Sequence, residues 1–224
     1  MRIRSCSNKR GITLLELLVA LVIFGIVTAG SYRLFVAQSK AYVVQDQVVE
    51  IQQNIRAAME ILLRDLRMAG FDNDRTSKIP IAGYNPIVPG DHSLTISYEH
   101  DSMTQYSVVF WRDENTSRLL RQLTTTKDDG SSVPGPQDVI LENVDALDFS
   151  YGVALLIGGN EDGMVDQWED DSTKIGSNKV VAVRVQLTAR PEPVNPDVKT
   201  MVSPRTLEST VALRNLTFKP LGSH

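Results

Sequence analysis

The sequence predicts an α+β protein in which one long N-terminal helix carries an antiparallel β-sheet. Three observations lead to this prediction: a nearly uncharged apolar run near the N-terminus, a helical periodicity that continues beyond it, and segments of alternating polarity in the rest of the chain. The chain has 224 residues, which suffices for one sizeable domain and an accessory element. Its composition, 42% hydrophobic and 22% charged, is ordinary for a globular protein.

The charge distribution is uneven. The first ten residues contain Arg2, Arg4, Lys9 and Arg10 and no acidic residue. Without them, Lys+Arg falls from 23 to 19 against 27 Asp+Glu, and the formal net charge changes from −4 to −8. Such an acidic chain argues against nucleic acid as the main partner, because phosphate binding requires a basic surface. The only cysteine, Cys6, lies in the same segment, so the remainder has no thiol for disulfides, catalysis or metal binding.

Residues 12–32 read ITLLELLVALVIFGIVTAGSY, with Glu16 as the only charge. About 20 helical residues span the hydrocarbon core of a bilayer. The basic residues before this run place the start of the chain in the cytoplasm and the remainder in the periplasm of a Gram-negative cell.

Three interpretations of this segment compete: a secretory signal, a plain signal anchor and a functional membrane helix. A secretory signal has a shorter apolar core. Neither of the first two explains Glu16, since a carboxylate in an apolar span costs about 2.5–3.5 kcal/mol and usually has a partner and a function.

The run Lys9–Arg10–Gly11 followed by Ile12–Glu16 resembles the type IV prepilins, a family that includes pilus subunits and the pseudopilins of type II secretion. The resemblance implies that a membrane prepilin peptidase cleaves after Gly11 and that the new terminus at Ile12 is N-methylated. Ile12 stands where the family more often has Phe. The implied partners are other pilins, both major and minor, the prepilin peptidase, the inner-membrane assembly platform and the lipid bilayer.

Glu16 is the predicted assembly residue. Cleavage after Gly11 creates an ammonium group at Ile12, one helical turn before the carboxylate of Glu16. Within one helix the two charges compensate each other, and between adjacent subunits the same pairing also sets the axial register. Breaking such a desolvated pair leaves a costly unpaired charge.

The apolar pattern narrows to one stripe beyond Tyr32, which predicts an amphipathic helix with a charged opposite face. Gly70 follows the last periodic residue and suits a helix C-cap. A continuous helix from Ile12 to Ala69 is about 85 Å long. Packing on the chain's own β-domain is expected, and a dimeric coiled coil is the alternative. The stripe consists of Val44, Val48, Ile51, Ile55, Ala58 or Met59, Leu62, Leu66 and Ala69.

Two segments resemble a narrower group, the PilW-type minor pilins. They are the helix end Arg56–Phe71, with its Asp–Leu–Arg and Ala–Gly–aromatic runs, and the closing strand Ser209–Leu216. The J-type pseudopilins of type II secretion share much of this layout and are the next closest.

Alternating residues predict the strands of the sheet, and Asp113–Asn115 between two of them is a hairpin turn signal. Loops rich in Pro and Gly are expected at 71–92, 124–137 and 190–204. The expected strands are 94–98, 105–111, 118–123, 147–151, 180–187 and 210–216.

An acidic loop at 158–169 resembles the EF-hand calcium pattern. Gly158 stands where the pattern requires Asp, which lowers the expected affinity to about 10⁻⁴–10⁻³ M, and Asp170 or Asp171 would have to compensate. The alternative interpretation is a solvated hairpin loop. The candidate Ca²⁺ ligands at positions 3, 5, 7, 9 and 12 are Asn160, Asp162, Met164, Asp166 and Glu169.

No enzymatic motif is found in the sequence. The histidines, His92, His100 and His224, do not have metal-ligand spacing, and neither a nucleophile elbow nor a phosphate loop occurs. We therefore expect no catalytic residues, no enzymatic activity and no required cofactor.

The expected function is that of a structural minor pilin of a type IV pilus, which acts in initiation or at the filament tip. The alternatives are a minor pseudopilin of a type II secretion system and, from another class, a membrane-anchored adhesin or calcium-binding module. The expected location is the inner membrane, in a single pass with the N-terminus cytoplasmic, followed by the pilus at the cell surface. The expected parts are a cleaved leader (1–11), a membrane and assembly helix (12–36), an amphipathic helix (37–70) and a β-rich domain (71–224).

Overall fold

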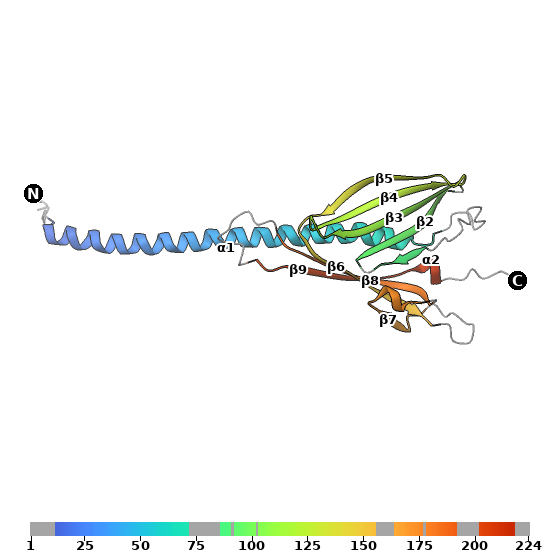
Figure 1. The fold of residues 1–224 in the computed structure, drawn as a ribbon. Coiled ribbons are helices and arrows are strands. Elements are labelled where there is room, and N and C mark those ends of the chain that lie inside the picture. Colours follow the sequence, from blue (N-terminus) through green and yellow to red (C-terminus); the bar gives the residue numbers. More distant parts are fainter. Residues whose placement is uncertain are drawn as a thin grey trace, which may run out of the picture. The chain divides into compact units, whose positions relative to one another are not determined.

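A computed structural model describes residues 12–71, 86–90, 92–101, 103–155, 164–176, 178–191 and 202–217. The chain divides into two compact units, Met1–Asp46 and Gln47–His224, which we describe one at a time. Helix α1, Leu14–Met68, supplies the described structure of the first unit, and its last part belongs to the second (Figure 1). The second unit contains all the described strands. The predicted α+β class, a long apolar N-terminal helix followed by antiparallel sheets, is confirmed.

In the second unit, α1 packs by the predicted stripe. Six apolar side chains of this part of the helix and Ala69, just after its end, are buried, whereas Arg56, Glu60 and Arg64 on the other face are exposed. The stripe is covered by the chain's own sheets, which leaves it unavailable to a coiled-coil partner. The buried residues are Ile51, Ile55, Ala58, Met59, Leu62, Leu66 and Ala69.

Gly70 ends α1, as its sequence position indicated. Its φ of +69° lies in the left-handed region, which favours glycine, and its N–H donates to the carbonyl of Ser97 at 2.9 Å. The side-chain amide of Asn215 donates to the carbonyls of Arg67 and Ala69, at 3.2 Å each. Carbonyls at the end of a helix have no partner within the helix, so Asn215 joins the C-terminal segment to the end of α1.

Two antiparallel sheets cover the part of α1 that belongs to the second unit, from two sides (Figure 1). The first is a five-stranded meander in the order β1-β2-β3-β4-β5. The second has the order β7-β6-β8-β9. The strands are β1 (Ile87–Pro89), β2 (Ser93–Asp101), β3 (Thr104–Asp113), β4 (Arg118–Lys127), β5 (Ser132–Leu141), β6 (Val144–Ala154), β7 (Gln167–Glu169), β8 (Lys179–Ala189) and β9 (Arg205–Ala212), with a 3-10 helix η1 (Ser172–Lys174) and a short helix α2 (Arg214–Thr217).

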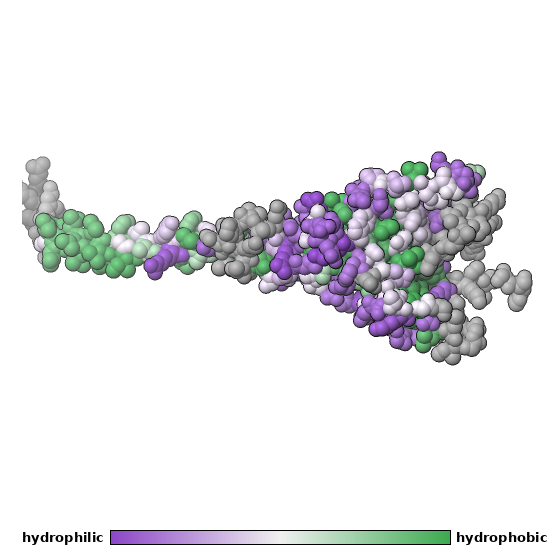
Figure 2. Space-filling view, in the orientation of Figure 1, coloured by the Kyte–Doolittle hydropathy of each residue, from purple (hydrophilic) through white to green (hydrophobic). Residues whose placement is uncertain are grey.

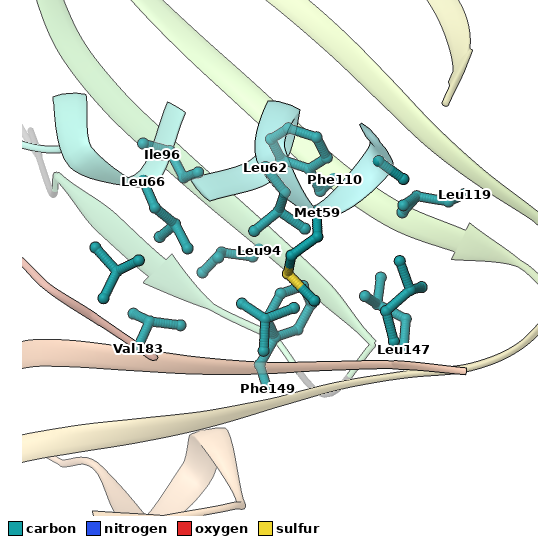
Figure 3. Packing of buried hydrophobic residues seen from close by; sticks show 14 of the residues in the cluster. Met59, Leu62, Leu66, Leu94, Ile96, Phe110, Leu119, Leu147, Phe149 and Val183 are labelled. Atoms are coloured by element: carbon teal, nitrogen blue, oxygen red, sulfur yellow. The ribbon is translucent and has the colours of Figure 1, made fainter. Parts of the chain in front are cut away.

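The core lies between the sheets, around α1. Leu62 and Leu66 contribute side chains with no exposed surface, and Met59 lies beside them (Figure 3). Phe110 of β3 reaches the helix from the first sheet and Phe149 of β6 from the second. Because every apolar side chain buried here leaves water, this three-layer arrangement is the main source of stability for the second unit.

Two sequence predictions about strands are corrected by the structure. Residues 124–137 were expected to be a loop, but Thr124–Lys127 continue β4 and Ser132–Gln137 begin β5. β5 lacks alternation because it is an exposed edge strand, the position in a sheet that tolerates its prolines. The closing strand was expected at 210–216, but β9 ends at Ala212 and α2 follows from Arg214.

Two short strands also lie in segments expected to be loops. β1 falls within 71–92 and β7 within the acidic loop. Each has three residues, too few for an alternating pattern to be recognised in the sequence. The turn at Asp113–Asn115 is confirmed, because the carboxylate of Asp113 accepts the N–H of Asn115 at 3.0 Å.

Candidate assembly site on the N-terminal helix

Thr13 caps the start of α1. Its hydroxyl oxygen accepts the backbone N–H of Glu16 at 3.3 Å, and its carbonyl accepts the N–H of Leu17 at 3.2 Å. Thr13 and Glu16 therefore occupy the cap and third positions of a Thr-x-x-Glu capping box. Sequence analysis singled out Glu16 for its charge but missed Thr13, although this three-residue spacing is a recognisable signal.

The capping position gives Glu16 a second physical role. The first N–H groups of a helix have no partner within it, and in hydrocarbon each unsatisfied group costs several kcal/mol. An acid in the first turn also faces the positive end of the helix dipole. The Thr13 hydroxyl thus satisfies one of these N–H groups, and the charge of Glu16 is favourable beside the positive end of the helix dipole.

The apolar surface of α1 in the first unit is exposed to solvent. One 18-residue window has a mean hydropathy of 2.3, and none of its residues is buried. By length and composition, α1 is the one helix in the described residues able to cross a membrane. Figure 2 shows hydrophobic residues covering the visible face of the N-terminal stretch of α1, before hydrophilic residues appear further along the helix. The large apolar side chains of this stretch are well exposed, among them Leu14, Leu21 and Phe24 at 80%, 68% and 71%.

The predicted processing residues are only partly described. Ile12 precedes the cap and is exposed, whereas Gly11 lies outside the described residues. Cleavage after Gly11 and methylation of Ile12 stay predictions.

The described part of the acidic loop forms local hydrogen bonds. A carboxylate oxygen of Asp166 accepts the N–H of Leu155 at 2.8 Å, which joins the two ends of the loop. Glu169 accepts the side-chain amide of Gln167 at 2.5 Å. Met164 is exposed, and Asn160 and Asp162 lie outside the described residues.

Asp171, a proposed substitute ligand, has a local role instead. Its carboxylate caps η1 by accepting the N–H and hydroxyl of Thr173, at 2.9 and 2.6 Å. Both hydrogen bonds lower the pKa of Asp171, and the one from the Thr173 hydroxyl has the larger effect. Across the described ranges, no group of three or more His, Cys, Asp or Glu side chains is arranged to hold a metal ion.

The N-terminal segment of the chain matches a known family. Residues 6–32 match the family described as the prokaryotic N-terminal methylation motif. No curated protein matches the chain. The matched segment contains the predicted cleavage position, the cap and Glu16, and it ends within the exposed apolar part of α1.

The motif indicates a protein of the type IV pilin or pseudopilin kind, a structural and normally non-enzymatic class. It implies processing by a prepilin peptidase and assembly with other pilins. The exposed apolar helix is consistent with membrane anchoring.

Proposed function

We propose that this chain is a minor pilin, a structural subunit of a type IV pilus that acts in initiation or at the filament tip. The observation that carries the proposal is the start of α1, where Glu16 stands at the third position of the helix and is the only charge in an exposed apolar run that extends to Tyr32. Such a surface is costly in water and is relieved by lipid before assembly and by other pilin helices after it.

The proposed assembly step pairs two charges inside an apolar environment. After cleavage, Ile12 carries an ammonium group next to the cap residue Thr13, and Glu16 carries the opposite charge. The pairing of this amine with the Glu16 of a neighbouring subunit compensates both charges and sets the axial register. In low dielectric the pair is much stronger than in water, and an unmatched register leaves both charges unpaired.

The size of the second unit supports a minor rather than a major role. Two sheets with nine described strands form a large domain, which suits a single place at a filament tip better than every turn of a closely packed shaft. A minor pseudopilin of a type II secretion system is the alternative within the class. A membrane-anchored adhesin is the alternative outside it, and it requires no cleavage. The proposed topology is a single pass, with the N-terminus cytoplasmic and the second unit periplasmic until assembly.

Two substitutions of Glu16 separate charge from capping. Gln can also complete a capping box, so Glu16→Gln removes the charge alone, while Glu16→Ala removes both. We expect both variants to insert and to lose residues 1–11, but to be largely absent from sheared filaments. Asp46→Asn is the matched control, because it removes an exposed acid of α1 outside the apolar run and should assemble normally.

Mass spectrometry of the membrane-bound and filament-bound protein supplies the readout. The expected product begins with a methylated Ile12. Retention of residues 1–11 in functioning cells would favour the anchored adhesin and reject the pilin proposal. Incorporation of Glu16→Gln at the level of Asp46→Asn would reject the register role of the charge while leaving the processing intact.

A further inference from the structure

The outer edge of β9 is an open template for strand pairing. β9 ends the second sheet, and within the described ranges no strand pairs with its outer side. All eight residues pair with β8 in continuous register, from Ala182 opposite Ala212 to Ala189 opposite Arg205. In an antiparallel ladder, alternate residues direct their N–H and C=O groups away from the paired strand. β9 therefore offers a regular row of backbone donors and acceptors.

The other edges of the two sheets are protected against such pairing. β1 and β7 have three residues each. β5 contains Pro134 and Pro136, and its register with β4 shifts beside them. A side chain at Gly135 would meet the carbonyl of Leu123 at 2.8 Å, so the strand is also locally bent inward. Prolines, irregular register and short length protect these three edges. β9 has none of these three features, and its charged residues are Arg205, at the start of the strand, and Glu208.

Strand β9 is also stabilised by its pairing with β8. Its neighbour β8 contributes Val183, Val185 and Leu187 to the core with no exposed surface. A hydroxyl pair, Thr188 and Thr206, joins the two strands at 2.8 Å. The edge thus keeps its shape before a partner arrives, which lowers the entropic cost of adding a strand.

We propose that β9 accepts an extended strand from a neighbouring pilin-type subunit. This inference rests on the proposed function and specifies a second contact, in addition to the helix contact made by α1. The added strand should place apolar side chains beside Leu207 and Val211 on the core side of the sheet. On the outer side it should place polar residues; the acid there, Glu208, already lies 3.5 Å from Arg184 of β8, so its charge adds little preference for a basic residue.

A second copy of this chain fits the edge poorly. Its β5, β1 and β7 are protected, which leaves only its own β9. In Figure 1, β9 runs lengthwise along the domain part of α1. An antiparallel β9–β9 pair would therefore reverse one helix, whereas subunits inserted in one membrane point the same way. A parallel pair would turn the helix-bearing faces of the two sheets to opposite sides.

Cysteine-directed photo-crosslinking tests the proposal in intact membranes. Once the leader is removed the chain has no cysteine, so Thr206→Cys, Glu208→Cys and Thr210→Cys each carry a single thiol for a short photoreactive probe. All three positions are exposed. We expect each probe to join one segment of another pilin-type subunit, with the attachment point moving along that segment as the probe moves along β9. Gln137→Cys and Val139→Cys on β5 are the matched controls and should not join that segment.

A probe at Leu21→Cys on α1 separates this inference from the proposed function. Crosslinks to other pilins from α1 but none from β9 overturn the edge proposal and leave the pilin proposal standing. If neither α1 nor β9 gives crosslinks to other pilins, the edge proposal and the pilin proposal are both wrong. Three other outcomes also overturn the edge proposal. The β5 probes could give the same crosslink yield as the β9 probes, or the attachment point on the partner could fail to move as the probe moves along β9. The third outcome is a crosslinked product between two copies of this chain.

Proline substitution provides a second measurement. Of two adjacent residues, Glu208 and Ser209, one directs its N–H toward β8 and the other outward. Glu208→Pro and Ser209→Pro should therefore differ: one should lower the melting temperature, and the other should keep it but lose incorporation into filaments. Normal incorporation of the variant that keeps its melting temperature contradicts strand addition.

Discussion

Replacing Arg121 with methionine should leave the carboxylate of Asp65 without its nearest cation inside the core. Asp65 lies on the buried side of α1, and its side chain is only 4% exposed. Arg121 of β4 donates through Nε to the carboxylate at 2.8 Å and is itself 15% exposed. This pair joins the helix to the first sheet, and Arg121 also lies 6.0 Å from the ring centre of Phe110.

The expected cost follows from the geometry. Removing one partner of a buried ion pair typically costs about 3–5 kcal/mol, because the other charge stays buried and unpaired. Arg64 approaches the second oxygen of Asp65 at 3.7 Å, but its side chain is 69% exposed and compensates weakly. We therefore expect Arg121→Met to lower the free energy of unfolding by about 3 kcal/mol. Replacing both residues, as Asp65→Leu with Arg121→Met, should cost much less than either single change, because no charge is left buried.

Urea unfolding of the full chain in detergent provides the assay. The two tryptophans, Trp111 of β3 and Trp168 of β7, both report on the second unit. Tyr98 gives a second readout: its pKa is raised first by burial and then by the charge of Asp65, while Arg121 lowers it. Arg121→Met should thus raise the pKa of Tyr98 further. A cost below about 1 kcal/mol, the range of surface pairs, or a double variant as unstable as the sum of the single ones, would refute the reasoning.

Two further predictions concern Gly70 and the acidic loop. Gly70→Ala should cost at least about 1–2 kcal/mol, because the left-handed φ of +69° disfavours any other residue and the added carbon would overlap the side chain of Leu216; an unchanged urea midpoint would contradict this. The EF-hand hypothesis for the acidic loop predicts heat in isothermal titration of the full chain at millimolar Ca²⁺, and Asp162→Ala and Asp166→Ala should then abolish that heat; the alternative, a solvated loop, predicts none. Asp166→Ala should also lower the melting temperature without calcium, because its carboxylate holds Leu155. No heat and no thermal shift would reject calcium binding.

Much of the fold could be predicted from local patterns. The sequence predicted the buried stripe from Ile51 to Ala69 and the glycine that follows it. Both could be predicted because helix periodicity and left-handed caps depend on neighbouring residues. β5 could not be predicted. It is exposed, so burial imposes no alternation of polar and apolar residues, and its prolines indicate a loop. The division of the strands into two sheets also escaped sequence analysis, because pairing between distant segments leaves no local pattern.

The candidate site divides in the same way. Glu16 stands out in the sequence because a lone charge in an apolar run is costly, and its spacing from Thr13 was equally available. Asp65 was noted only as part of the Asp–Leu–Arg run, and its burial was not predicted, since an acid followed by Leu66 and Arg67 resembles an ordinary exposed position. Only the arrival of Arg121 from 56 residues further along the chain makes its burial tolerable.

The sequence by itself determined the membrane-type helix, the methylation motif and the acid at its start, because these depend on residues within a few turns of one another. The tertiary structure decided which strands end the sheets, which edge is unprotected and which charges are buried. Those properties depend on the packing of segments that are far apart in the chain. The same local sequence pattern can favour different conformations in different tertiary surroundings.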